Sequence, residues 1–434
     1  MTTARRLALT LGSSGVILAL NVIGGVLSAR TLGVSGRGLL AAITLWPVTI
    51  AYLGDLGVPL ALTYFAAAET DLRPALLSTA LVIGLVQVVV LALAGVVIVA
   101  FALGPRYGAS SAILAAIFMV AWIPVNLLGR YPNAINQGAQ RFRSYNLVRL
   151  TVAVVYVAGS ATCFLLQLRS VPWFLAATWA ASGTAAILAL AGLHERVTLR
   201  GYQAALVRRI LGYGLRAHIG NVAPIDVFQL DLLAVVVLIG AQASGLYSVA
   251  SSAAGVLQTA AVAFGVVAMP ALAASAAGDR GRLAGLFMKT ALVLIGVTGV
   301  VLFALIGYLL PLVYGRPFQG AVPLAQTLIV AAFLGSMRVL LGGCMRGMGR
   351  PLAATVSEVS GLVAGIIALA VLVPARGALG AAEAMIIAYA CSLAITTTLA
   401  VRAGLPLRRL VWVSSDEVEA GRRLLVGLRG ARVA

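Results

Sequence analysis

The chain has 434 residues, of which 62% are hydrophobic and 10% are charged, and its mean hydropathy is +1.06. Soluble domains carry about 25% charged residues, so this composition excludes a soluble globular protein. A net charge of +19 would indicate nucleic-acid binding in a soluble domain. Here the basic residues gather in loops between apolar runs, so the charge indicates membrane topology and no nucleic-acid partner.

Apolar runs of membrane-spanning length recur from end to end, which predicts an all-α polytopic membrane protein. Twelve transmembrane helices are expected, at 7–29, 38–66, 75–103, 110–131, 145–168, 171–193, 210–239, 245–272, 285–312, 321–344, 351–374 and 378–401. The first run is too long for the apolar core of a signal peptide. Most of the 31 Lys and Arg residues then lie on the side of the N-terminus, so both termini are predicted to be cytoplasmic.

Two short motifs recur at nearly the same offset and indicate a duplication. LGVSGRGLLA at 32–41 matches IGAQASGLYS at 239–248, and places Gly38 over Gly245, 207 positions later. QGAQR, after the fourth span, matches RGMGR, after the tenth, at an offset of 209. Since six spans is an even number, the two halves share one orientation and form two six-helix lobes related by a pseudo-two-fold axis along the membrane normal. The alternative is that small-residue turns look alike by chance.

The duplication predicts four segments. These are an N-terminal six-helix lobe (1–193), a basic cytoplasmic linker (194–209), a C-terminal six-helix lobe (210–402) and a basic amphipathic tail (403–434). The tail is expected to lie on the inner leaflet. No loop is long enough to be a nucleotide-binding domain, and no G-x-x-x-x-G-K-[ST] motif occurs, which excludes a transporter that carries its own ATPase.

Neither an enzyme nor a metal site is expected from the outer loops and the cysteines. The predicted outer loops contain no Asp, Glu or His before Glu383, so acid–base catalysis is not expected. The three cysteines lie in apolar spans without metal-ligand spacing, so no metal and no cofactor is expected.

The polar residues inside the membrane are the candidate site. Asn126, Arg130 and Asn133 follow one another at i, i+4 and i+7 along the end of the fourth span. Counting about 1.5 Å of rise per residue, five charges from both halves fall in the cytoplasmic third: Asp55, Arg130, Arg216, Arg338 and Glu358. Arginine suits phosphate and amides suit sugar hydroxyls, so these residues predict a site for an anionic, hydroxyl-bearing headgroup.

Each of these residues also has a structural interpretation. The Arg130 side chain could extend to the cytoplasmic interface, where arginine is favoured. Asp55 and Glu358 could be counter-ions that allow arginines to be buried.

The outer end is predicted to hold a gate. Arg30 and Arg37 flank the turn after the first span, and Asp231 ends the seventh span, its repeat counterpart, so Asp231 is expected to pair with Arg30 or Arg37. Interfacial placement without pairing is the alternative. Asp226 and His218 in the seventh span are candidates for binding a coupling ion, Na⁺ or H⁺.

Three segments resemble the polysaccharide-repeat-unit flippases: LSARTLGVSGRGLLAAITLWP, DLLAVVVLIGAQASGLYSVASS and RGMGRPLAATVSEVSG. These are the O-antigen and teichoic-acid exporters of the multidrug/oligosaccharidyl-lipid/polysaccharide exporter superfamily, and the resemblance covers residues 7–402. It implies a two-lobe alternating-access transporter in the bacterial inner (cytoplasmic) membrane. The implied substrate is an oligosaccharide on undecaprenyl pyrophosphate, with a polysaccharide polymerase and a chain-length protein as partners. Arg30, in R-T-L-G, is similar to the cavity arginines of the lipid II flippase branch.

Three other functions are weighed against this one. A cation-coupled multidrug antiporter of the same superfamily would use Asp55 and Asp226 as ion-binding carboxylates, although convergent arginines suit an organic cation poorly. A major facilitator would carry a G-x-x-x-D-R-x-G-R-R loop after the second span, and that loop reads AAETDLRPA. A non-transporting cell-wall assembly scaffold would not need buried arginines.

Overall fold

The computed structural model describes residues 3–195, 201–222, 229–274 and 280–405, and these contain twelve α-helices, two short 3₁₀ helices and no strand. The first half contains α1 (Thr3–Gly54), α2 (Val58–Ala68), η1 (Thr70–Leu72), α3 (Arg73–Tyr107), α4 (Ala109–Gly138), α5 (Phe142–Leu165) and α6 (Val171–Ala191). The second contains α7 (Ala204–Val222), α8 (Leu230–Leu238), α9 (Ala241–Ala274), α10 (Arg280–Tyr314), η4 (Arg316–Ala321), α11 (Val322–Gly347) and α12 (Pro351–Arg402). Eight of the described helices or helix pairs are long and apolar enough to cross a membrane, so the predicted all-α polytopic membrane protein is confirmed.

The two longest helices each contain two predicted spans. Helix α1 runs through the first predicted span and most of the second, and bends at Gly33, whose φ is 67°. Such a φ is strained for a residue with a Cβ but not for glycine, so at Gly33 the chain can turn from one helical segment directly into the next. Helix α12 holds the last two predicted spans and bends in the same way at Gly377.

The second and seventh predicted spans are each divided between two helices. The second breaks at a turn between α1 and α2, where the Asp55 carboxylate accepts the backbone N–H of Gly57 at 2.8 Å. Leu56 and Gly57 both have positive φ in this turn. The seventh is divided between α7 and α8, and residues 223–228 between them lie outside the described part of the chain.

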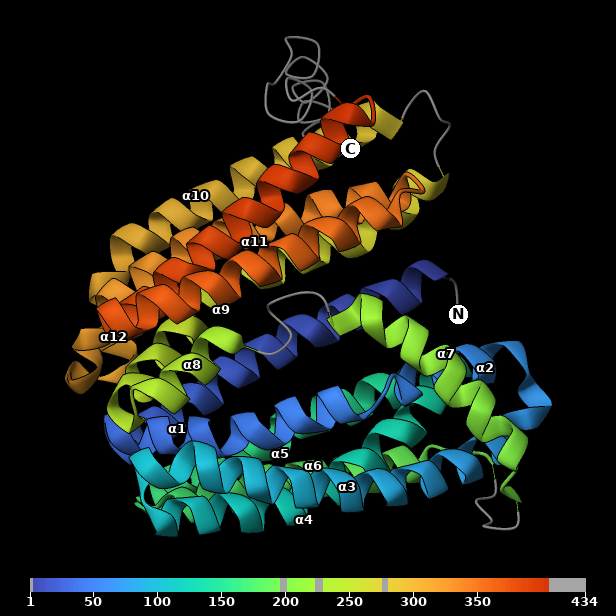
Figure 1. Ribbon diagram of the computed structural model, residues 1–434, viewed down its shortest axis with the longest axis horizontal. Coiled ribbons are helices and arrows are strands. Elements are labelled where there is room, and N and C mark those ends of the chain that lie inside the picture. The colour runs from blue at the N-terminus through green and yellow to red at the C-terminus, as the bar shows by residue number, and fades with distance from the viewer. Residues whose placement is uncertain (1–2, 196–200, 223–228, 275–279, 406–434) are drawn as a thin grey trace, which may run out of the picture.

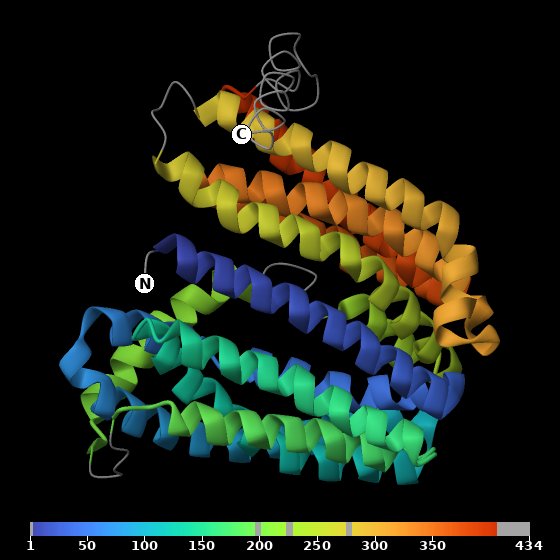
Figure 2. The same cartoon turned by 180° about the vertical axis from the view of Figure 1, so that it is seen from behind.

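The helices form two lobes (Figure 1). Helices α1–α6 make up the first lobe and α8–α12 the second, and the view from behind shows the same two layers (Figure 2). Helix α7 belongs to the second half of the sequence but packs against α2 and α3 of the first lobe. There Tyr64 stacks on Tyr213 with ring centroids 4.5 Å apart, and Arg209 forms an ion pair with Glu69. The second lobe therefore begins at α8, which packs against α9 and α12.

The lobes meet where α1 crosses α9. A Cβ added at Gly38 would collide with the carbonyl oxygen of Ala241, and one added at Gly245 would collide with the carbonyl oxygen of Val34. Both pairs of positions, 34 with 241 and 38 with 245, are 207 residues apart. The contact of Gly38 with Ala241 is therefore equivalent to that of Gly245 with Val34, as expected where equivalent segments meet on a two-fold axis. The pseudo-two-fold relation between the lobes follows from this contact.

Candidate functional site

A carboxylate in the turn between α1 and α2 organises the inner polar cluster. Asp55 is 3% exposed, and its Oδ2 accepts from the guanidinium of Arg130 on α4 at 2.7 Å. The Arg130 guanidinium also lies 5.8 Å from the centre of the Tyr52 ring. His218 of α7 places Nδ1 3.6 Å from Asp55 Oδ1. The structure thus places Asp55 as the counter-ion of Arg130, and leaves the Arg130 side chain 30% exposed.

The amides on either side of Arg130 are only partly satisfied. Asn126 and Asn133 lie about one turn before and after it on α4. The side-chain oxygens of both are buried and accept no hydrogen bond from the described residues. A buried polar atom without a partner is costly, so such atoms mark places where water or a ligand polar group can bind. The predicted stripe therefore does have unused hydrogen-bonding capacity beside an arginine.

No described interaction joins the other predicted charges to this cluster. Arg216 lies exposed on α7. Arg338 is buried on α11, with its guanidinium 5.4 Å from the centre of the Tyr389 ring, and Glu358 pairs with Arg346 at 3.3 Å. The rise per residue predicts the depth of a side chain but not the direction in which it points around the helix axis, so charges at one depth need not face one another.

The outer-end arginine bonds to backbone carbonyls instead of Asp231. Arg30 donates from Nε to the carbonyl of Val313 and from Nη2 to that of Leu312, both at 2.7 Å. These carbonyls belong to the last turn of α10, where helix acceptors lack intrahelical partners. Asp231 instead accepts the hydroxyl of Tyr247, on α9, at 2.7 Å. Neither Arg30 nor Arg37 is paired with Asp231 among the described ion pairs, so that detail of the predicted gate is corrected, although Arg30 does bridge the two lobes.

A cavity of about 450 Å³ lies between α1 of the first lobe and α8 and α9 of the second. Its α1 wall carries Arg37, Thr44 and Thr49, and its opposite wall is rich in hydroxyl and amide side chains: Gln229, Ser248, Ser251, Ser252 and Gln258. The Nε of Arg37 is buried without a described hydrogen-bond partner. No Asp or Glu is among the described residues that line this cavity.

Continuing along α1 leads from this cavity to the inner cluster. Thr44, Val48, Tyr52 and Asp55 lie three or four residues apart, which keeps them on one face of a helix. This face of α1 and the turn that follows it therefore connect Arg37, in the cavity, to the Asp55–Arg130 pair, which lies where α1 ends. Neither Arg216 nor Arg338 lines the cavity.

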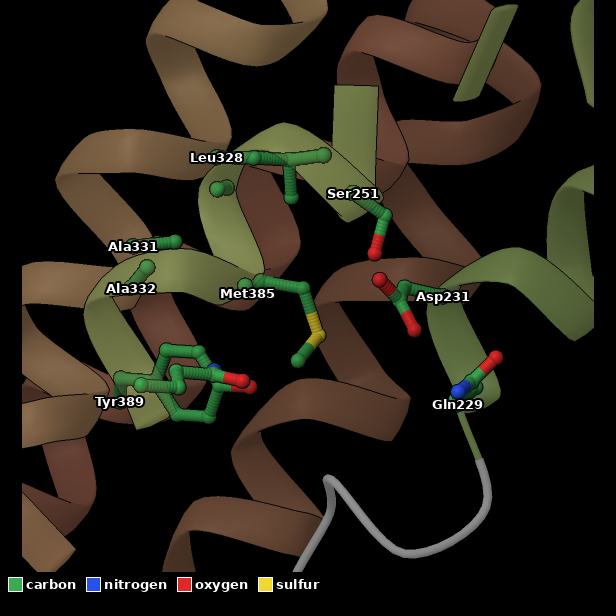
Figure 3. Close-up of a pocket in the computed structure, with 11 residues that line it drawn as sticks. Gln229, Asp231, Ser251, Leu328, Ala331, Ala332, Met385 and Tyr389 are labelled. Carbon is green, nitrogen blue, oxygen red and sulfur yellow. The ribbon is translucent and has the colours of Figure 1, made fainter. Parts of the chain in front are cut away.

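A smaller pocket of about 100 Å³ opens from the cavity into the second lobe. The two share Gln229, Ser251 and Gln258. Figure 3 shows the Asp231 carboxylate and the Ser251 hydroxyl pointing toward each other across it, with Met385 beside them. Asp231, on the second-lobe side, is thus the carboxylate among the described residues that line this pocket.

The serine and threonine lining was not anticipated from the sequence. A helical serine usually bonds to its own backbone, and Ser248 and Ser252 do donate to the carbonyls of Gly245 and Ser248. A hydroxyl that donates in this way can still accept a hydrogen bond through its oxygen. A ligand can use this capacity only where the serine faces a cavity. The repeated spacing of hydroxyls in YSVASS was the available signal.

Some predicted features lie outside the described residues. They are Asp226 and the basic tail from residue 406 onward. Among the residues that the structure does describe, no group of three or more His, Cys, Asp or Glu side chains could hold a metal ion.

Comparison with known proteins agrees with this architecture. The family model for polysaccharide biosynthesis proteins matches residues 5–276, more than half of the chain. A search of curated protein sequences found no match to this chain. Among solved structures, lipid II flippase MurJ in an inward closed conformation is similar with a TM-score of 0.77 and 12% identity, over 93% of this chain and 89% of that one.

Transporters of the multidrug resistance MATE family share the fold as well. An inward-facing member of the MOP superfamily gives a TM-score of 0.66 at 14% identity, over 89% of this chain and 94% of that one. An outward-facing one gives 0.62 at 14% identity, over 92% and 94%. These neighbours are transporters and a flippase rather than enzymes, in agreement with the expectation from the outer loops.

Proposed function

Because the chain belongs to the family of polysaccharide biosynthesis proteins, we propose that it is a lipid-linked oligosaccharide flippase. It moves undecaprenyl-pyrophosphate-linked repeat units from the inner to the outer leaflet of the bacterial cytoplasmic membrane by alternating access. The repeat units serve cell-surface polysaccharides such as O-antigen or teichoic acid, and a polysaccharide polymerase and a chain-length protein act on them afterwards.

The observation that carries this proposal is the lining of the inter-lobe cavity. A phosphate needs cationic donors, and Arg37 supplies a guanidinium with a buried, unused N–H. A glycan needs groups that both donate and accept, and the facing wall supplies hydroxyls and amides. A volume of about 450 Å³ is within the range of small-molecule sites. The lining therefore suits a phosphorylated saccharide, while the lipid tail stays in the bilayer.

Arg130 is the proposed first contact for the headgroup. Its side chain is still partly exposed beside Asp55, and the unsatisfied oxygens of Asn126 and Asn133 flank it. The lobes lie closest at the end of the molecule that holds α8 and splay toward the N-terminus (Figure 1). If both termini are cytoplasmic, as the basic loops predict, the end at which the lobes diverge faces the cytoplasm, where the substrate is made.

The proposal is tested by flipping of a fluorescent undecaprenyl-pyrophosphate oligosaccharide in proteoliposomes. Arg37→Gln removes the cavity cation, and since hydrogen bonds to charged groups contribute about 1.5–3 kcal/mol, transport should fall at least about tenfold. Arg208→Gln, which removes an exposed charge on α7, is the matched control and should transport normally. Wild-type protein that leaves this lipid unmoved would refute the proposal.

A cation-coupled multidrug antiporter is the second candidate, and the pocket around Asp231 favours it. A carboxylate that lines the pocket adjoining the cavity can bind a coupling Na⁺ or H⁺, and MATE transporters share the fold. The same proteoliposomes distinguish the two functions. Export of a cationic dye along a sodium or proton gradient, without lipid flipping, would favour the antiporter.

A further inference from the structure

One buried titratable side chain has no part in the function proposed above. His218 of α7 is 9% exposed, and its Nε2 is buried with no hydrogen-bond partner among the described residues. Its Nδ1 faces the Asp55 carboxylate, and its ring lies 5.9 Å from that of Tyr52. An imidazole that is enclosed, faces a carboxylate and has an unused nitrogen is placed to exchange a proton.

The charged neighbours of this imidazole come from several elements. The α1–α2 turn contributes Asp55, α1 contributes Tyr52, and α4 contributes Arg130 through the same carboxylate. Tyr64 of α2, and Glu69 directly after α2, engage residues nearer the start of α7. From α3, the hydroxyl of Thr79 accepts a hydrogen bond from the backbone N–H of Gln203, just before α7. On α7 itself, Arg216 is exposed.

Two cationic groups thus share one carboxylate. With His218 neutral, the single charge of Asp55 is balanced by Arg130, and the cluster is neutral. A proton taken from water onto the imidazole gives Asp55 a second cationic partner and leaves the cluster with one excess positive charge. In a poorly solvated site such a charge is costly unless an anion compensates it, and the partly exposed Arg130 is where an anion can bind.

We propose that His218 and Asp55 form a proton-binding site, and that an anionic phosphate headgroup bound at Arg130 takes up a proton there. The linkage is reciprocal, because a ligand that favours protonation is itself bound more tightly by the protonated form. The proton offsets part of the phosphate charge while the headgroup is inside the protein. This inference rests on the proposed headgroup contact at Arg130.

Proton uptake on binding is measurable by calorimetry. The full-length protein in nanodiscs is titrated near pH 7 with an undecaprenyl-pyrophosphate oligosaccharide, whose two phosphates are both esterified and so do not titrate themselves in this range, in two buffers of different ionisation enthalpy. Wild type should take up a fraction of one proton per lipid, and its affinity should rise about tenfold from pH 8 to pH 6. His218→Gln should bind with an affinity that no longer depends on pH and without proton uptake. His194→Gln, at the other, exposed histidine of the chain, should behave as wild type.

The outcomes separate the two proposals. Lipid binding by wild type without proton uptake, or uptake that persists in His218→Gln, would overturn the proton site and leave the flippase standing. No lipid binding by wild type at any pH would overturn the flippase and this inference together. Should His218→Gln fail to fold, His218→Asn, which also removes the imidazole, replaces it in the same titrations, and wild type that binds the lipid without proton uptake overturns the proton site whichever variant folds.

Discussion

Asp55 holds the inner cluster together, and its removal should be more harmful than the removal of the whole ion pair. Asp55→Asn leaves Arg130 without its counter-ion in a poorly solvated place, which should lower the free energy of unfolding by about 2–3 kcal/mol. Asp55→Asn combined with Arg130→Gln should recover most of this stability, because no charge is then left unpaired. The double variant should remain inactive in flipping. Thermal unfolding in detergent of the single and double variants tests this, and equal destabilisation by both would contradict it.

Glu195 illustrates a charge outside the membrane-spanning helices. Burial raises the pKa of its carboxyl, but hydrogen bonds from Arg141, at 2.6 and 2.7 Å, outweigh this and hold the pKa below its ordinary value. A depressed folded-state pKa stabilises the protein above the unfolded-state pKa, and that stability is lost as pH falls through the folded-state value. Glu195→Gln should therefore cost about 1 kcal/mol or less at pH 7. Its difference from wild type should vanish in acid, and a difference that grew as pH fell would refute this assignment.

Which polar residues matter was only partly readable from the sequence. Arg130 and its flanking asparagines were found because a polar stripe stands out in an apolar run. The contact of Arg338 with Tyr389 was not predictable, because the depth of a residue does not say which face of α11 carries it. Ser251 and Thr44 were not predicted as site residues, because the sequence does not show which helical hydroxyls line the cavity between the lobes.

The crossing of α1 and α9 depends on two glycines, and a single methyl group should disrupt it. Gly38→Ala or Gly245→Ala would collide with a backbone carbonyl of the other helix, which cannot move aside as a flexible side chain can. The lobes should then part at this end, and transport should be lost. Gly25→Ala on α1, where a Cβ would meet no atom, should be harmless.

Cavity accessibility tests this prediction. A cysteine at Ser251, inside the cavity, should react severalfold faster with a membrane-impermeant maleimide from the outside in either glycine variant than in Gly25→Ala. Unchanged labelling in both variants would show that the crossing does not close the cavity.

Helix ends were harder to predict than helices. Each span predicted from hydropathy overlaps a described helix, because an apolar run long enough to cross the bilayer is rare outside transmembrane helices. Hydropathy could not detect the breaks at Asp55–Gly57 or between α7 and α8, because a few residues barely alter a running average. The predicted C-terminal lobe, 210–402, includes most of α7 because it follows chain order. In the structure, Tyr213 and Arg209 attach that helix to the first lobe.

For the molecule as a whole, the duplication was the most informative prediction, because matched glycines in two loops correctly implied a symmetric meeting of the lobes. Ser35 and Gln242 are exposed on the two sides of that meeting and are themselves 207 positions apart. Spin labels at these sites, with the three native cysteines replaced, would report the separation of the lobes. Alternating access requires two distance populations in the presence of substrate lipid, and a single population during transport would exclude opening at this end.

Arg30 should set the balance between those two populations. Its two hydrogen bonds to the last turn of α10 join the lobes, and they must break when the lobes part at this end. Charge-assisted bonds contribute about 1.5–3 kcal/mol, so Arg30→Ala should shift the equilibrium toward the longer Ser35–Gln242 distance by about tenfold or more. Arg106→Ala, which removes an exposed arginine at the end of α3, provides the matched control. If Arg30 binds substrate instead of holding the lobes together, its loss would weaken lipid binding and leave the distance distribution of the lipid-free protein unchanged.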